Sequence, residues 1–398
     1  MMKTELLAPA GNASKLETAL YFGADAVYVG GKAFSLRSFA DNFSEDGLRT
    51  AAERAHALGK KLYVAVNIFA RNPDFGALSD YFSFLRESGA DAAIVSDPGV
   101  IYAAKKSAPG LPLHLSTQAN TTNKYAVKFW SEQGISRVIL ARELSLPEIA
   151  EIKDFVPETE IEVFVHGAMC ISYSGRCLLS DYLDGRPPNR GACVQACRRS
   201  YRLQTSNSSG EEFSLPVEED GRGTYLLNSK DLNLFFRLSE LEKAGVDSFK
   251  IEGRMKSEYY LATVINAYRR AMDGGNAEKL CGELDNVAHR EYTEAFVCGK
   301  NPQTVSYRDN QTKGNCTYIA NVLGMEDGFA VVQMRNRFHA GDELEVLSPG
   351  ENFGKSFPVQ DMFDGTGERS EDAKLVLGTY KIACPYRLAQ GDILRRRN

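Results

Sequence analysis

Short apolar runs alternate with longer amphipathic stretches from residue 5 to about residue 272. Each run is three to five residues long and rich in Val, Ile, Leu or Ala, which is typical of strands. Alternation of such strands with helices predicts βα units around a parallel sheet. The eight predicted strands are 6–8, 26–29, 62–66, 92–95, 113–115, 137–140, 161–165 and 249–251.

A repeated joint links the helical stretches to the strands that follow. Each copy has a glycine, an apolar residue and a polar residue, at Gly23, Gly89, Gly134 and Gly245. Glycine takes the left-handed position that ends a helix, and the polar residue begins the turn into the sheet. Four copies and eight strands predict a (β/α)₈ TIM-like barrel. An open doubly wound sheet would more often carry a glycine-rich dinucleotide fingerprint, and Gly30-Gly31-Lys32 is too short to be one.

The barrel domain is predicted to span residues 1–272 and to carry a long insertion. The seventh strand ends at Val165 and the helix before the eighth runs over about 232–243, so residues 166–228 are a Cys-rich insertion in the seventh βα loop. That loop lies on the catalytic face of a barrel. Its strand-like runs predict a small β cap over the barrel mouth; they are 201–205, 213–217 and 225–227.

The pattern of predicted helices and strands changes after the barrel. Residues 273–304 are predicted to be a helical connector, and residues 305–398 a separate small β-barrel. Its predicted strands are 316–322, 329–334, 343–346 and 393–397, with a hairpin turn signal at Glu326-Asp327-Gly328.

Composition narrows the class of protein. At 398 residues and 43% hydrophobic content the chain can fill one large and one smaller core. No apolar run approaches the roughly 20 residues needed to cross a bilayer, and the start of the chain has no signal-like apolar region, so a cytoplasmic location without a membrane is expected. The net charge of −5 means that any nucleic-acid binding must be local. Basic runs at 198–202, 269–270 and 395–397 are candidates, although a solvated surface is the commoner explanation.

Four of the eight cysteines fall within 28 residues, at Cys170, Cys177, Cys193 and Cys197. Thiolates are soft ligands, and four on loop backbone can bind zinc or an iron–sulfur cluster. Disulfides do not suit a reducing compartment, and the residues between the thiols are too polar for buried core cysteines. Paired Cys-x2-Cys knuckles, typical of zinc, are absent, which favours the cluster and leaves zinc as the rival.

Polar residues follow the predicted strands, where side chains share the barrel mouth. The run from Lys250 to Lys256 is the strongest group, because Glu252 and Arg254 could together hold an anion. His166 could be an acid or base, a partner of the cluster, or an ordinary buried histidine. For each residue the alternative is a polar side chain that caps a loop. The predicted catalytic residues are His166, Glu252 and Arg254, and the predicted substrate-binding residues are Gln118, Asn120, Arg142, Lys250 and Lys256.

Several motifs together resemble the signature of peptidase family U32. They are Leu6–Gly11, Gly23–Tyr28, Glu162–Cys170, Tyr173–Ser180, Asn228–Asp231 and Lys250–Lys256. The family takes its name from a reported collagenase activity, whereas its better understood members are similar to oxygen-independent hydroxylases with a 4Fe-4S cluster. The resemblance implies that Cys170, Cys177, Cys193 and Cys197 are the four cluster ligands.

Within the family, residues 189–198 and the C-terminal β-barrel resemble the members that hydroxylate tRNA. This implies formation of 5-hydroxyuridine at the wobble position, tRNA as partner and prephenate as a required metabolite. A small-molecule oxygen donor and an electron donor, neither identified by the sequence, are implied as well. The C-terminal domain is similar to the second domain of translation factors, which would suit contact with tRNA.

Two other functions stay open. A peptidase needs a nucleophile with a base, or a metal with an open coordination site. The five histidines form no His-Glu-x2-His pair, and no Gly-x-Ser-x-Gly motif occurs. A zinc ion bound by four thiolates would have no open coordination site for catalysis. The third possibility is an RNA-binding module stapled by zinc.

Overall fold

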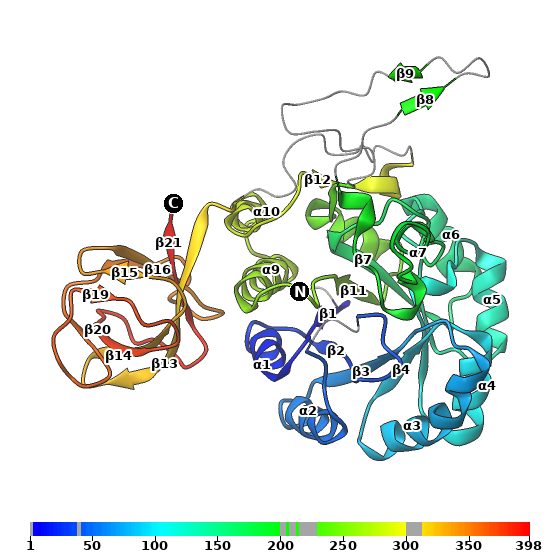
Figure 1. The fold of residues 1–398 in the computed structure, drawn as a ribbon, viewed down its shortest axis with the longest axis horizontal. Coiled ribbons are helices and arrows are strands. Elements are labelled where there is room, and N and C mark those ends of the chain that lie inside the picture. The colour runs from blue at the N-terminus through cyan, green and yellow to red at the C-terminus, as the bar shows by residue number, and fades with distance from the viewer. Residues whose placement is uncertain (1–2, 38–40, 200–203, 207–211, 215–228, 300–312) are drawn as a thin grey trace.

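The protein consists of a large α/β domain and a smaller β domain beside it (Figure 1). The computed structural model describes residues 3–37, 41–199, 204–206, 212–214, 229–299 and 313–398. No helix in these ranges is long and apolar enough to cross a membrane.

Eight parallel strands form a closed barrel. Each of the first seven pairs with the next, and β11 pairs in parallel with both β1 and β7, which closes the ring. This confirms the predicted TIM-like barrel and all eight of its strands. Their bounds are β1 (Glu5–Pro9), β2 (Ala26–Gly30), β3 (Lys61–Val66), β4 (Ala92–Val95), β5 (Leu113–Leu115), β6 (Arg137–Ile139), β7 (Glu160–Ala168) and β11 (Ser248–Ile251).

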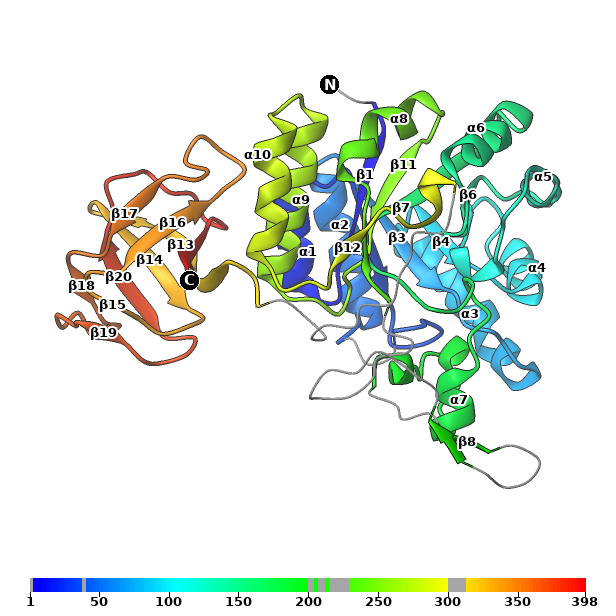
Figure 2. The same cartoon turned by 90° about the horizontal axis from the view of Figure 1, so that it is seen from above.

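The helices surround the barrel and are started by polar caps (Figures 1 and 2). The side chains of Asn12, Ser44, Asp97, Asn123 and Ser257 each accept a hydrogen bond from a backbone N–H of the first turn. The four joint glycines all have φ between 75° and 103°, as their predicted role requires. The helices are α1 (Ala13–Tyr21), α2 (Glu45–Ala57), α3 (Phe75–Glu87), α4 (Pro98–Ser107), α5 (Lys124–Glu132), α6 (Leu146–Phe155), α8 (Leu238–Lys243) and α9 (Glu258–Met272).

The seventh βα loop differs from the prediction at both of its ends. β7 continues to Ala168, where β10 (Asp231–Asn233) pairs with it in antiparallel fashion and β12 (Tyr292–Thr293) pairs with β10. The predicted helix over 232–243 is therefore wrong at its start: residues 231–233 are a strand, and the helical region begins with the 3₁₀ turn η5 (Phe235–Arg237). Pairing with β7 outweighs the local helical pattern there.

The predicted β cap is described only in part. β8 (Gln204–Ser206) and β9 (Glu212–Ser214) form an antiparallel hairpin. Both views draw it projecting outward past α7 (Leu179–Asp184), and not across the strand ends (Figures 1 and 2). Residues 201–203, 215–217 and 225–227, which the prediction also included, lie outside the described residues.

The connector contains α10 (Ala277–Cys281) and the 3₁₀ turns η6 (Gly282–Asn286) and η7 (Ala295–Cys298), together with the short strand β12. The C-terminal domain that follows is an antiparallel half-barrel with the strand order β17-β16-β21-β13-β14-β20-β18. Its predicted hairpin turn is present, with Asp327 and Gly328 both at positive φ. The strands are β13 (Cys316–Glu326), β14 (Phe329–Met334), β15 (Phe338–His339), β16 (Glu343–Leu347), β17 (Ser356–Pro358), β18 (Met362–Phe363), β19 (Asp372–Ala373), β20 (Thr379–Ala383) and β21 (Ile393–Arg397).

Two arginines join the half-barrel to the rest of the protein. Arg395, fully buried on β21, pairs with Glu345 of β16 and with Glu283 of η6 at 2.7 Å. Arg270 of α9 donates to the carbonyls of residues 348–350, and its guanidinium lies 4.3 Å from the centroid of Phe353. A buried pair of this kind positions one domain against the other and is costly to break.

Contacts within the protein make two of the three basic runs, residues 269–270 and 395–397, poor candidates for nucleic-acid binding. Arg269 pairs with Asp25 and Asp273, and Arg270 faces the half-barrel. In the terminal run, Arg395 is buried, and Arg396 and Arg397 pair with Asp342 and Glu345. These arginines serve the fold.

We expect Arg395→Ala to lower the free energy of unfolding by about 3–5 kcal/mol, because it removes the ion-pair partner of Glu283 and leaves Glu345 paired with Arg397 alone. Arg369→Ala is the matched control. Arg369 is an exposed arginine of the same domain paired with Asp361, and its loss should change stability by no more than about 0.5 kcal/mol. Urea unfolding measures both, and equal stability of the two variants would contradict this role of Arg395.

Candidate functional site

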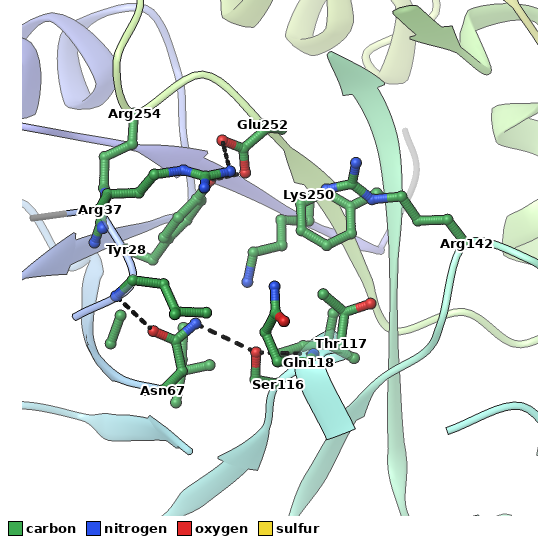
Figure 3. Close-up of a pocket in the computed structure, with 15 residues that line it drawn as sticks. Tyr28, Arg37, Asn67, Ser116, Thr117, Gln118, Arg142, Lys250, Glu252 and Arg254 are labelled. Atoms are coloured by element: carbon green, nitrogen blue, oxygen red, sulfur yellow. Dashed lines mark hydrogen bonds and ion pairs between the residues drawn. The ribbon is translucent and has the colours of Figure 1, made fainter. Parts of the chain in front are cut away.

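A pocket opens at the carboxyl ends of the barrel strands (Figure 3). Parallel strands end on the same face, so residues far apart in the sequence meet there. The empty space between them, including the part open to solvent, is about 560 Å³. The lining residues are Tyr28, Leu36, Arg37, Ala65, Asn67, Ile94, Ser116, Thr117, Gln118, Ile139, Arg142, Phe164, Lys250, Glu252 and Arg254.

The floor of the pocket is a compensated ion pair. Lys250 of β11 donates to Glu162 of β7 at 2.7 Å, and both side chains are buried. Glu162 also accepts from Arg137 at 3.2 Å, and the Lys250 ammonium lies 4.4 Å from the centroid of Tyr28. A carboxylate with two cationic partners meets the requirement that buried charge be paired. Lys250 is therefore held in place and brings little free charge to the pocket.

One wall of the pocket carries Glu252, which faces Arg37 at 3.5 Å and accepts from the Tyr28 hydroxyl at 3.3 Å. Burial alone would raise the pKa of Glu252. Four cations, led by Arg37, outweigh burial and hold that pKa below its usual value. Glu252 is consequently a carboxylate at neutral pH and anchors Arg37 at the pocket.

Arg142 and Arg254 are the two pocket cations whose charge is not neutralised: neither forms an ion pair with a carboxylate in the described part of the chain. Arg254 is buried and donates to Ser35 at 2.7 Å; burial first, and Arg37 second, lower its pKa to about 10, so it remains charged at neutral pH. Arg142 lies 3.9 Å from the centroid of Phe164 and donates to the carbonyl of Ala168. Within the described residues, the Nε atoms of both arginines are buried without a hydrogen-bond partner. Two such arginines can together hold a small anion.

Five of the eight predicted catalytic and substrate-binding residues line this pocket: Gln118, Arg142, Lys250, Glu252 and Arg254. Asn120 does not; it follows η2 (Thr117–Ala119) with a left-handed backbone, at φ 55°. Tyr28 and Arg37 were missed by the sequence analysis. Arg37 follows the second predicted strand by several residues, whereas the predicted site residues lie at or just after strand ends.

His166 lies outside the pocket because of a β-bulge. Phe164 pairs with Lys250, but the next registered pair is His166 with Ile251, so Val165 is an extra residue in β7. A bulge reverses the alternation of side chains. The His166 ring therefore faces α9, with its Nδ1 atom 3.3 Å from the Tyr268 hydroxyl.

The surroundings of His166 keep it neutral. Burial lowers its pKa to about 3, helped by the charges of His289 and Lys256. The rings of Tyr260, Tyr268 and Tyr292 have centroids within 6.0 Å of it. It is not positioned to exchange protons with the pocket.

Lys256, also predicted to bind substrate, lies on the same side as His166. Its ammonium is 5.0 Å from the centroid of Tyr260 and donates to the carbonyl of Ala288 at 3.4 Å. Burial lowers its pKa, while the carboxylate of Asp231 opposes the change. The turn after Glu252 carries Lys256 away from the pocket.

The cysteine segment, residues 170–199, is docked on the rim of the pocket. The backbone N–H of Ser174 donates to Glu143 at 3.0 Å, and Gly175 lies so close to Gln118 that a Cβ atom would be 2.0 Å from its carbonyl oxygen. Arg190 pairs with Asp74 at 2.9 Å. Only glycine fits at position 175, where φ is also +74°. These contacts tie the segment to the loops that follow β3, β5 and β6.

The four cysteines of this segment are all free and share one neighbourhood. Burial raises the pKa of Cys197 to about 11, Arg198 opposes this, and the other three thiols raise it further. The pKa of Arg37 at the pocket is raised chiefly by Glu252, and also by Cys170 and Cys193. Cys197 is therefore influenced by the other three thiols, and Cys170 and Cys193 influence Arg37 at the pocket.

The spacing of the thiols bears on the kind of metal. In the described residues, no group of three or more His, Cys, Asp or Glu side chains is arranged to hold a single metal ion. Zinc would require all four sulfurs around one point, whereas the thiolates of an iron–sulfur cluster each bind a different iron and stand farther apart. Four soft thiol donors in one docked segment suit an iron–sulfur cluster or zinc. The backbone N–H of Gln195 also donates to the sulfur of Cys193 at 3.4 Å, a contact that suits a thiolate.

Comparison with known proteins identifies the family. The model of Peptidase family U32 matches residues 11–306, and that of the Peptidase family U32 C-terminal domain matches residues 314–395. The chain belongs to peptidase family U32. It is 39% identical to tRNA hydroxylation protein P of Escherichia coli, over 92% of this chain and 91% of that protein. It is 38% identical to tRNA hydroxylation protein P1 of Bacillus subtilis, over 99% of this chain and 95% of that protein.

A solved structure of the same family, the U32 peptidase Mk0906, is 12% identical and aligns with a TM-score of 0.42. The alignment covers 63% of this chain and 93% of that one. The barrel described above follows from the strand pairing of this U32 member and does not depend on that alignment.

We expect Glu252→Gln to lower the free energy of unfolding by about 1–3 kcal/mol at pH 7, because Arg37 loses its ion-pair partner at the pocket. The pKa of Glu252 is lower in the folded than in the unfolded protein. Its stabilisation is therefore complete above the unfolded pKa of about 4.3 and is lost as the pH falls through the folded value. The difference in the free energy of unfolding between wild type and Glu252→Gln should be largest at neutral pH and should disappear in acid.

Urea titrations at several pH values measure this difference, and Glu151→Gln is the control. Glu151 is an exposed carboxylate paired with Lys124, and its loss should change stability by no more than about 0.5 kcal/mol at any pH. A Glu252→Gln effect that stays constant with pH would contradict the ionised state of Glu252.

Proposed function

We propose that this protein is an iron–sulfur-dependent, oxygen-independent tRNA hydroxylase that forms 5-hydroxyuridine at the wobble position. The observation that carries the proposal is the docking of the cysteine segment, which holds four free thiols, on the rim of a pocket with two arginines that form no ion pair within the described residues. The names of the relatives, tRNA hydroxylation proteins at 38–39% identity over nearly the whole chain, support RNA hydroxylation as the reaction.

The pocket would bind the small oxygen donor. Arg142 and Arg254 would each meet a carboxylate, and a dicarboxylate such as prephenate has the two charges that these arginines leave unbalanced. Apolar side chains of the lining, such as Leu36, Ile94 and Ile139, would contact the rest of such a molecule. Glu252 would not repel it strongly, because its own charge is shared with Arg37. Binding would thus bury the donor at the strand ends, next to the thiols.

Hydroxylation at C5 of uridine is a net insertion of one oxygen atom into a C–H bond and removes two electrons from the base. The donor would give up the oxygen atom and take up those electrons, so molecular oxygen would not be required. A bound four-iron cluster would supply transfer of single electrons. Glu252, which is ionised at neutral pH, would be the carboxylate available to accept a proton from the uridine ring. Lys250 would keep the floor of the pocket rigid through its pair with Glu162.

Peptide hydrolysis is a poorer match to these residues. Among the described residues that line the pocket there is no histidine, and the hydroxyl of Ser116 contacts Asn67 and the backbone of Gln118. A serine without a base nearby is a weak nucleophile. The sequence lacks the paired Cys-x2-Cys knuckles typical of zinc, which favours the cluster over an RNA-binding module held together by zinc.

The proposal predicts that Cys197→Ser, purified without oxygen, loses most of its iron and sulfide and fails to restore 5-hydroxyuridine in tRNA from a strain that lacks this protein. Loss of one of the four cysteines would leave one iron of the cluster without a protein ligand. Cys298→Ser is the matched control, because Cys298 is exposed on η7 and hydrogen-bonds with Glu294. Iron and sulfide analysis and mass spectrometry of tRNA nucleosides are the measurements. Wild-type protein without iron, or full activity of Cys197→Ser, would overturn the proposal.

A second prediction concerns the donor. Arg254→Ala should weaken binding of prephenate by about 10- to 150-fold, the loss of a charge-assisted contact worth about 1.5–3 kcal/mol. Calorimetric titration of the anaerobic protein measures this. Arg86→Ala, which removes an exposed arginine of α3, should leave the affinity unchanged. Unchanged affinity in Arg254→Ala would remove this arginine from the donor site.

A further inference from the structure

The cysteine segment carries large apolar side chains on its surface. Tyr182 is 87% exposed, Leu178 71% and Tyr173 59%, in a stretch that also exposes Ile171 and Leu183. Leu178 and Tyr182 lie one helical turn apart, since the N–H of Tyr182 donates to the carbonyl of Leu178. Exposed apolar groups that gather in one place mark a surface that meets a partner. Residues 171–183 form the aromatic rim.

The charge around the aromatic rim is opposite to that of the protein as a whole. Residues 170–199 contain five arginines and two aspartates, whereas the whole chain has a net charge of −5. Two of these arginines serve the fold, because Arg190 pairs with Asp74 and Arg199 with Asp184. Arg176 is exposed and forms no ion pair within the described residues. Arginines of the runs at 269–270 and 395–397 contact groups of the protein itself, whereas this segment offers the exposed Arg176 to a polyanion.

The aromatic rim borders the pocket. Ser174 and Gly175 are the residues that dock on Glu143 and Gln118, and Tyr173 and Arg176 flank them in one turn, with the N–H of Arg176 donating to the carbonyl of Tyr173 at 3.0 Å. Gln118 itself lines the pocket. α7 lies on the side of the barrel where the strands end (Figure 2). A chain that inserts one base into the pocket would have its neighbouring nucleotides over this rim.

We infer that the aromatic rim binds the anticodon loop, with bases that flank the wobble uridine stacked on Tyr173 and Tyr182 and phosphates near Arg176. The inference rests on the proposed function and adds the surface that receives the RNA. A base that enters a pocket must leave its stack, and its neighbours lose one stacking face each. Exposed tyrosines replace such faces without selecting a sequence, and arginine supplies the charge.

The test measures binding of an anticodon stem-loop RNA with uridine at the wobble position to the anaerobically purified full chain. Tyr173→Ala and Tyr182→Ala should each weaken binding by about 5- to 150-fold, the range for loss of one stacked base. Tyr173→Phe and Tyr182→Phe keep the ring and should bind within about twofold of wild type. Arg176→Ala should reduce the salt dependence of binding by about 0.7 in the slope of log affinity against log salt.

Tyr102→Ala and Tyr125→Ala are the matched controls. These tyrosines are 63% and 68% exposed on α4 and α5, away from the cysteine segment, and their loss should leave RNA affinity unchanged. Iron content and prephenate affinity are measured in every variant and should equal those of wild type, which separates the rim from the pocket and the thiols.

Two results would overturn the inference while leaving the proposed function intact. One is wild-type RNA affinity in both alanine variants together with normal hydroxylation. The other is a wild-type dimer that dissociates in Tyr182→Ala with RNA affinity unchanged, which would make the rim an interface between copies of this chain. If wild-type protein with full iron content neither binds nor hydroxylates the RNA, the proposed function fails, and the inference fails with it.

Discussion

The pairing of β7 with β11 is the contact on which the rest of the site depends. It closes the barrel and sets Lys250 opposite Phe164 at the strand ends. It also brings Lys250 to Glu162, so that the only way to bury both is as an ion pair. The bulge in the same pairing turns His166 toward α9, and the extension of β7 to Ala168 delivers the cysteine segment to the pocket rim. One strand pair thus sets the pocket floor, the orientation of His166 and the origin of the cysteine segment.

Charge in this protein follows two different rules. Inside the barrel and between the domains, Glu162 and Arg395 are each buried with charged partners, because an unpaired charge there would cost several kcal/mol. At the pocket the rule is broken, since Arg142 and Arg254 are held by a neutral hydroxyl, a carbonyl and an aromatic face. Such local departures from charge balance are expected where a ligand completes the site. The balanced pairs stabilise the fold, and the unbalanced pair defines the ligand.

The cysteine segment links two chemistries on one face of the barrel. Its inner contacts are polar and specific: Gly175 fits against Gln118, and Ser174 and Arg190 bind acidic residues of the neighbouring loops. Its outer surface exposes aromatic side chains and Arg176. A loop held this firmly at its base can place thiols beside a pocket while it offers a separate surface to a large partner. The half-barrel is attached on another side of the barrel, through α9 and η6 (Figure 1).

The sequence by itself determined the barrel, its eight strands and the cysteine quartet, because each has a local signal: a continuous apolar run, a glycine that must take positive φ, or a fixed thiol spacing. It also identified five pocket residues, since residues after parallel strands must meet. Only the tertiary structure decided that His166 faces outward, that Arg37 joins the pocket and that Arg395 is buried between domains. Those outcomes depend on strand register and on contacts between distant segments, which no local pattern encodes.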